Sequence, residues 1–270
     1  MPEYPKLESR IPLANDITVK VVETTASATV TVVVADTGGC YLTNSTTTAS
    51  SFLRAFQSAL TNNATLAGTY AVGISDGNAT ATGKVTISVT GVDSFSLVWS
   101  STSYGSLART IMGFSTDLNI GSASYTGANA SPYIWLPDVG RTEPMGPDAL
   151  VSNQYPAQDS DLVVVEAPSG ASYAYSYGRR GRERMAFRYL TANKVHILNE
   201  STTNESLQKF WQIMLDDSGM VFRLAPDRSV DTITVDYRAM WPSFRAEPTE
   251  PGWTGSKSKW AVFWDAIEKV

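Results

Sequence analysis

The feature that most constrains the fold of this chain is a block between residues 30 and 114 in which strand-like segments outnumber helical ones. An apolar run at 30–34 opens the block, a helical pattern follows at 51–60, and three segments then alternate apolar with small or polar residues up to Trp99. This alternation has the period of two that a half-buried strand requires. No catalytic motif accompanies these elements, so their order favours a rigid assembly module over an enzyme.

One short helix is expected near the start of the block, after a first strand at 28–36. Phe52, Phe56 and Leu60 recur at helical spacing and give the helix one apolar face. The hydroxyls of Thr46–Thr48 offer N-caps for it.

Three antiparallel strands are expected after this helix, at 70–74, 85–89 and 95–99. The turn signal Asp76-Gly77-Asn78 joins the first two. A second helix follows at 107–112, and Gly113 stands where a left-handed C-terminal cap is expected.

Composition and charge narrow the class of protein. Charged residues make up 17% of the chain, below the roughly 25% of average globular chains. The net charge of −5 disfavours a nucleic-acid partner, because affinity for phosphates comes largely from cationic groups. The 270 residues leave room for two ordinary domains.

We interpret the chain as mainly β with a few helices (α+β), in two β-rich domains that each hold an antiparallel sheet or sandwich and a packed helix. The segment 116–158 has weak periodicity and is rich in glycine, serine and proline, which suits a connector. The expected division is an extended N-terminal arm at 1–20, an α+β assembly domain at 21–115, an extended connector at 116–158 and a second β-rich domain at 159–270.

The second domain shows the strongest amphipathic pattern of the chain. Leu207, Phe210, Trp211 and Met214 follow helical spacing, and Thr202–Glu205 has the composition of a capping box. Strands are expected around this helix at 162–166, 173–177, 185–189, 220–224, 232–238 and 259–263.

A dense basic run is the candidate partner contact of the sequence. It comprises Arg179, Arg180, Arg182 and Arg184, and we expect it in a hairpin loop between two strands. Two interpretations stay open: contact with an acidic partner or phosphate, and a solvated loop tip.

The residues suited to metal or covalent chemistry are isolated. His196 is the only histidine and Cys40 the only cysteine, so a zinc site, a Ser-His-Asp triad and thiol catalysis have little support. Asp216-Asp217, Asp227 and Asp231 lack the spacing of a calcium loop. We therefore expect no enzyme, no catalytic residue, no metal site and no cofactor.

Two alternatives rest on aromatic and acidic residues. The seven tryptophans, with the tyrosines at 173–177, would stack sugars if exposed and would form core if buried. A glycan hydrolase would need two carboxylates to meet in a cleft. The candidates for such a pair are Asp159, Asp161, Asp216, Asp217, Asp227, Asp231 and Asp236.

The chain has one cysteine, no apolar run long enough to span a membrane and no signal peptide at its start. We expect synthesis in a host cytoplasm, without membrane insertion.

The order of these elements resembles virion structural proteins of tailed bacteriophages. The first block is similar to a module of such proteins through its helix at 52–60, its strands at 69–75, 83–88 and 95–99, and its segment 107–114. The second half resembles the C-terminal region of phage tail-tip proteins through 210–219, 222–227 and Gly252-Trp253.

The resemblance implies a distal tail or baseplate protein located in the virion tail. It implies self-association as a hexameric ring, with the tail tube, hub and fibres as further partners. The long connector exceeds what a minimal ring protein needs. A head-to-tail, decoration, fibre-attachment or carbohydrate-binding virion protein therefore remains the alternative.

Overall fold

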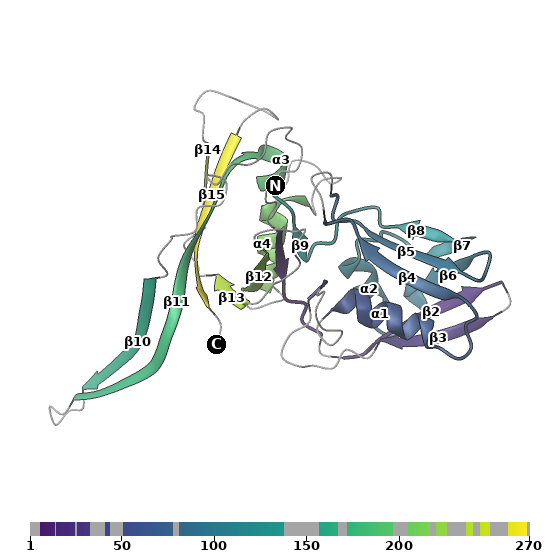
Figure 1. The fold of residues 1–270 in the computed structure, drawn as a ribbon, viewed down its shortest axis with the longest axis horizontal. Coiled ribbons are helices and arrows are strands. Elements are labelled where there is room, and N and C mark those ends of the chain that lie inside the picture. Colours follow the sequence, from purple (N-terminus) through teal and green to yellow (C-terminus); the bar gives the residue numbers. More distant parts are fainter. Residues whose placement is uncertain are drawn as a thin grey trace.

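The mostly antiparallel, β-rich fold expected from the sequence is confirmed by a computed structural model, in which a few short helices accompany the sheets (Figure 1). The structure describes residues 6–13, 15–24, 26–32, 41–43, 51–77, 81–137, 157–166, 172–196, 205–216, 220–225, 236–239, 244–248 and 259–268.

The first half of the chain forms two small sheets. The four-stranded sheet has the order β3 (Ser27–Val32), β2 (Ile17–Glu23), β6 (Phe95–Val98) and β7 (Leu118–Ser122), and the three-stranded sheet has the order β4 (Thr69–Ile74), β5 (Val85–Thr90) and β8 (Ser124–Thr126). Both sheets bury alternate apolar residues in one core, shared with the helices α1 (Phe52–Thr61) and α2 (Gly105–Ile111). Strand β5 shows the pattern clearly, because Val85, Ile87 and Val89 are buried while the residues between them are not.

The ends of the two helices follow local sequence rules. Ser51 caps α1 by accepting a hydrogen bond from the Arg54 backbone N–H at 3.4 Å; the caps expected at 46–48 lie outside the described residues. Gly113 ends α2 with a φ of +76°, and its N–H and that of Phe114 donate to the carbonyls of Thr110 and Arg109. These bonds form a Schellman cap, so the expected glycine cap is confirmed.

The second half forms a larger sheet. Its strand order is β10 (Ala157–Glu166), β11 (Ser172–Thr191), β15 (Lys259–Glu268), β13 (Asp236–Ala239), β12 (Val221–Ala225), β1 (Lys6–Ser9) and β9 (Ile134–Trp135), with β14 (Arg245–Pro248) also paired to β15. The helix α4 (Leu207–Asp216) packs its buried residues Phe210, Trp211 and Met214 into the core of this half. This confirms the amphipathic helix.

The capping box expected before α4 is wrong. Glu205 precedes the helix and lies 3.5 Å from the Lys194 ammonium group, at the end of the short helix α3 (Ala192–Val195). Ser206 caps α4 instead, because its Oγ accepts from the Lys209 N–H at 3.2 Å. Thr202 lies outside the described residues.

Two segments expected to be an arm and a connector contain regular strands. Strand β1 lies inside the large sheet, between β12 and β9, and β2 begins at Ile17 in the first half. Strands β7, β8 and β9 all fall within the expected connector 116–158. The described residues 6–13, 15–20 and 116–137 are therefore parts of the folded body rather than separate extended segments.

The two halves meet along β1 and β9. The side chain of Ile134 joins the core of the first half, and that of Trp135 joins the core of the second. In β1, Leu7 lies in the second core, whereas Lys6 and Glu8 contact Thr43 and Asp76 of the first half. Short strands with one face toward each half thus connect the two cores.

Candidate functional site: a projecting ribbon and a polar groove

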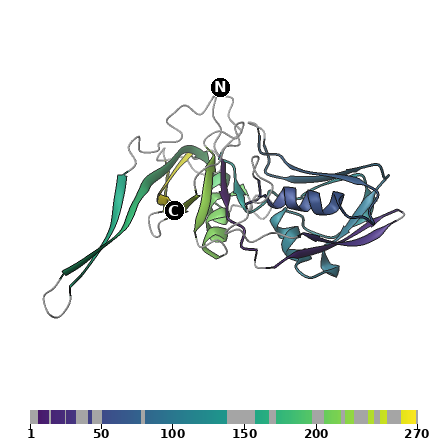
Figure 2. The same cartoon turned by 60° about the horizontal axis from the view of Figure 1, so that its bottom comes forward.

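A two-stranded ribbon projects from the large sheet. In Figures 1 and 2, β10 and the first part of β11 extend away from all other elements. Strand β11 pairs with β10 from Ser172 to Arg182, and it pairs with β15 only from Arg182 onward. In the part of the chain that the structure describes, the outer edge of β10 and the edge of β11 at 172–181 carry no third strand.

The outer half of the ribbon combines residues that favour strands. The apolar run 162–165 pairs with the alternating segment 173–176, so that Val163 lies opposite Tyr175 and Val165 opposite Tyr173. Aromatic and β-branched residues at directly opposed positions are the pairs that stabilise sheets most. The sequence of this half therefore specifies its register.

The four candidate arginines do not lie in a hairpin loop, so that expectation is wrong. They lie in β11, where Arg179 is opposite Ser160, Arg180 opposite Asp159 and Arg182 opposite Ala157. Arg184 is opposite Asp265 of β15. Strand alternation places positions 180, 182 and 184 on one face of the sheet and 179 on the other. The arginines thus form the stem of the ribbon, and two of them share register positions with carboxylates.

The sequence carries a turn signal between the two strands of the ribbon. The segment between β10 and β11 is 167–171, which contains Pro168-Ser169-Gly170, a combination typical of turns. These residues lie outside the described part of the chain.

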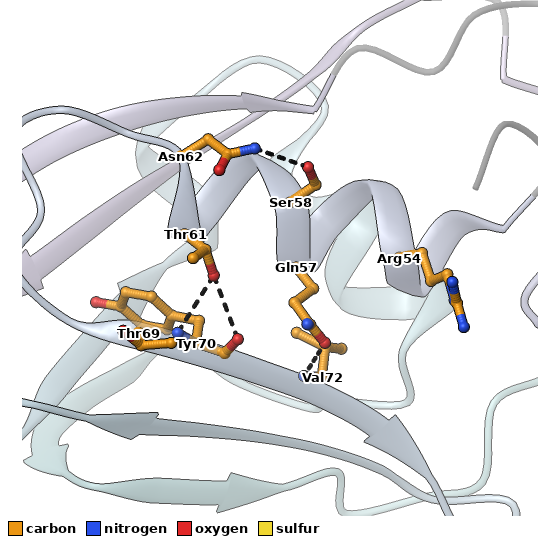
Figure 3. Close-up of a pocket in the computed structure, with 8 residues that line it drawn as sticks. All are labelled: Arg54, Gln57, Ser58, Thr61, Asn62, Thr69, Tyr70 and Val72. Atoms are coloured by element: carbon orange, nitrogen blue, oxygen red, sulfur yellow. Dashed lines mark hydrogen bonds between the residues drawn. The ribbon is translucent and has the colours of Figure 1, made fainter.

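A polar groove lies between α1 and β4 (Figure 3). Its volume is about 600 Å³, and its lining is Arg54, Gln57, Ser58, Thr61, Asn62, Thr69, Tyr70 and Val72. Figure 3 shows Gln57 and Thr61 pointing from the helix onto the strand, with Arg54 one turn further along the helix. Arg54 is the one charged residue among those that line the groove. Sequence reasoning assigned these residues only to a helix and a strand.

The other sequence candidates are not brought together. His196 packs its ring 4.3 Å from that of Trp260, and burial lowers the pKa of its imidazole. Asp216 ends α4 on the surface, whereas Cys40, Asp217, Asp227 and Asp231 lie outside the described residues. Among the described residues, no group of three His, Cys, Asp or Glu side chains is placed to hold a metal ion.

Most tryptophans that the structure describes are core residues. Trp99, Trp135, Trp211 and Trp264 are buried, and Trp260 is partly buried. Their rings pack against other aromatic rings; for example, Phe187 lies 5.1 Å from Trp135 and 5.4 Å from Trp264. These five rings therefore serve packing rather than an exposed sugar-stacking face.

No helix in the described ranges is long and apolar enough to cross a membrane. Comparisons of the chain with models of protein families, with curated proteins and with solved structures found no match.

Proposed function

We propose that this protein is a self-associating structural subunit of a phage tail tip, in which the β10–β11 ribbon reaches onto a neighbouring copy. The observation that carries the proposal is the ribbon itself, which leaves the body with both of its edges unpaired in the described residues. An isolated two-stranded hairpin is marginally stable in water. A partner that covers the ribbon supplies the missing stabilisation.

Charge supports a second copy of this chain as that partner. Residues 179–188 hold five arginines and one glutamate, a formal charge of +4, and the opposing segment 157–161 holds two aspartates, so the stem carries +2 and the rest of the chain −7 of the total of −5. The stem of the ribbon is therefore basic, while the remainder of an identical neighbour is acidic. Such complementarity orients an interface and speeds its formation.

A closed arrangement follows from the direction of the contact. A ribbon that binds a different surface of the next copy makes a head-to-tail contact, and head-to-tail contacts close into rings when the rotation permits. The sequence resemblance to tail-tip proteins favours six copies around a tail tube, with tube, hub or fibre proteins as further partners.

The mass of the intact assembly tests this proposal. Native mass spectrometry of the full chain should show a closed homo-oligomer, with six copies as the expected number. Replacing residues 161–178 by Asn-Gly shortens the ribbon between Ser160 and Arg179, two positions that already pair, so the variant should fold but remain monomeric. A monomeric wild-type protein, in solution and in particles, would contradict the proposal; so would a shortened variant that assembles normally.

A further inference from the structure

Strand β4 is an edge strand whose free side faces the helix α1. In its sheet β4 pairs only with β5. The Val89 N–H of β5 donates to the Ala123 carbonyl on the far side, at 2.9 Å, so the β5 residues that bond to β4 are the alternate ones at 86, 88 and 90. The backbone groups of Tyr70, Val72 and Ile74 therefore point away from β5. Tyr70 and Val72 line the groove of Figure 3, and Ile74 follows them in β4, beyond the lining residues.

Two side chains of α1 replace a neighbouring strand along part of this edge. The Thr61 hydroxyl lies 3.3 Å from both the N–H and the carbonyl of Tyr70, as donor to the carbonyl and acceptor from the N–H. The Gln57 carbonyl oxygen accepts from the Val72 N–H at 3.0 Å. Covering an edge in this way protects it from unwanted strand pairing.

The α1 side chains cover the edge of β4 no further than Val72, one helical turn before Arg54. Arg54 precedes Gln57 by three residues on the same stripe of α1, and Ile74 follows Val72 by two residues in β4. In the described structure, the Arg54 guanidinium makes no hydrogen bond or ion pair, and no side chain of α1 bonds to the outward backbone groups of Ile74. The groove thus offers a cation at its Arg54 end, and the next outward position of β4, Ile74, offers a backbone N–H and carbonyl beside it.

We propose that this end of the groove binds an extended peptide segment that carries a carboxylate. The backbone of such a segment pairs with the Ile74 N–H and carbonyl, as an added strand does at other sheet edges. Its carboxylate accepts hydrogen bonds from the Arg54 guanidinium, whose donors match a carboxylate in a bidentate manner.

The electrostatics at this point allow an acidic ligand although the chain is acidic overall. The first carboxylate after β4 in the chain is Asp76. Its Oδ2 lies 2.9 Å from the Lys6 ammonium group, so the two form an ion pair. None of the residues that line the groove is acidic. The site lies on a different surface from the ribbon and does not depend on the proposed function.

Titration with a synthetic pentapeptide tests the proposal. The probe is a peptide with an acetylated N-terminus and an amidated C-terminus, in which threonine and valine alternate around a central aspartate. The control peptide is identical except that asparagine replaces the aspartate. NMR titration of the full chain at low salt should show saturable shifts confined to 54–62 and 70–74. The asparagine peptide and the variant Arg54→Gln should each weaken binding about tenfold, the loss of one charge-assisted contact.

The variant Lys20→Gln is the matched control, because it removes one exposed positive charge from β2, away from the groove. It should bind the aspartate peptide like the wild-type protein. Since Arg54 is exposed, Arg54→Gln should also keep the thermal stability of the wild type. Lack of saturable binding to the wild type, equal affinity in Arg54→Gln, or shifts located in the ribbon would each overturn the proposal.

Discussion

At the scale of single residues, Glu23 shows how one buried carboxylate can join distant segments. It lies at the end of β2 and is 4% exposed. Its oxygens accept from the backbone N–H groups of Ala67 and Gly68 at 2.9 and 3.0 Å, and from the Tyr70 hydroxyl at 2.7 Å. Burial acts to raise the pKa of Glu23, but these three hydrogen bonds to the charged form outweigh it, so the pKa lies below its usual value.

The variant Glu23→Gln should therefore be destabilised at neutral pH by about 2 kcal/mol, because an amide has a single acceptor oxygen and places an NH2 donor where the second carboxylate oxygen accepts. A carboxylate whose pKa is lowered by folding contributes stability above its unfolded pKa and loses it as the pH falls through the folded value. Urea unfolding of the wild type from pH 7 to pH 3 should show this loss, and Glu23→Gln should show less of it. The variant Glu247→Gln, at an exposed residue, is the control. Equal pH dependence in the wild type and Glu23→Gln would argue against a stabilising role of the Glu23 carboxylate.

Sequence alone could not assign this role to Glu23. Glu23 stands at the end of β2 and does not disturb the alternation of apolar residues in that strand. Its hydrogen-bond partners lie more than forty residues further along the chain. The strand β2 itself was missed, since its residues 17–20 fall in a segment interpreted as an arm. Local patterns carry no information about such long-range hydrogen bonds.

At the scale of elements, α4 is anchored by Trp211. The indole is 5% exposed and lies 4.7 Å from the ring of Phe244 and 5.8 Å from that of Trp264. The variant Trp211→Ala should lose roughly 3 to 5 kcal/mol of stability through lost burial and the cavity that remains. Chemical denaturation measures this loss, with the exposed Gln212→Ala of the same helix as control. A variant with nearly wild-type stability would show that the helix does not need this anchor.

The stem of the ribbon supports a second element-scale prediction. Replacing Arg179, Arg180 and Arg182 by serine should weaken assembly while the fold is kept, because these positions lie beyond most of the pairing with β15. Pull-down against wild-type protein at two salt concentrations measures the effect, which should be largest at low salt. Serine at Lys20, Arg238 and Arg245, all exposed, gives a control with the same change of charge. Tight, salt-sensitive binding of DNA by the wild type would instead point to a nucleic-acid partner.

Elements with a strong local period were predictable, and elements defined by distant partners were not. The helices α1 and α4 were found because four or more apolar residues repeat at helical spacing in each. The hairpin of the ribbon was placed wrongly because Arg179–Arg184 includes a glycine and many charges, which resemble a loop. The two-residue strand β9 has no pattern of its own and exists only through its pairing with β1.

At the scale of the whole molecule, a buried ion network lies where the two halves meet. The Lys6 ammonium group is 1% exposed and lies 3.4 Å from Glu8 Oε1 and 2.9 Å from Asp76 Oδ2. The Thr43 hydroxyl donates to Glu8. Burial raises the pKa of Glu8, although Lys6 and Thr43 act in the opposite direction. Stability from Glu8 is therefore greatest at low pH and is lost as the pH rises through its folded pKa.

The variant Lys6→Met should lose about 3 to 5 kcal/mol at neutral pH, because it leaves the Glu8 carboxylate buried without its cation. The double variant Lys6→Met with Glu8→Leu should recover much of this loss, since it removes the two fully buried charges and leaves only Asp76, which is 17% exposed, without its partner. Thermal unfolding of the two variants beside the wild type gives the comparison. A single variant as stable as the wild type would show that the network does not hold the halves together.

The alternation of β9 between two cores has a thermodynamic consequence. Ile134 and Trp135 are neighbours in the chain, yet each is buried in a different half. Neither half can melt without withdrawing part of this dipeptide from its surroundings. The segment 7–11 imposes the same condition, because Leu7 is buried in the second core and Ile11 in the first. We therefore expect calorimetry to show one cooperative transition for the body, in place of the two that separate domains would give.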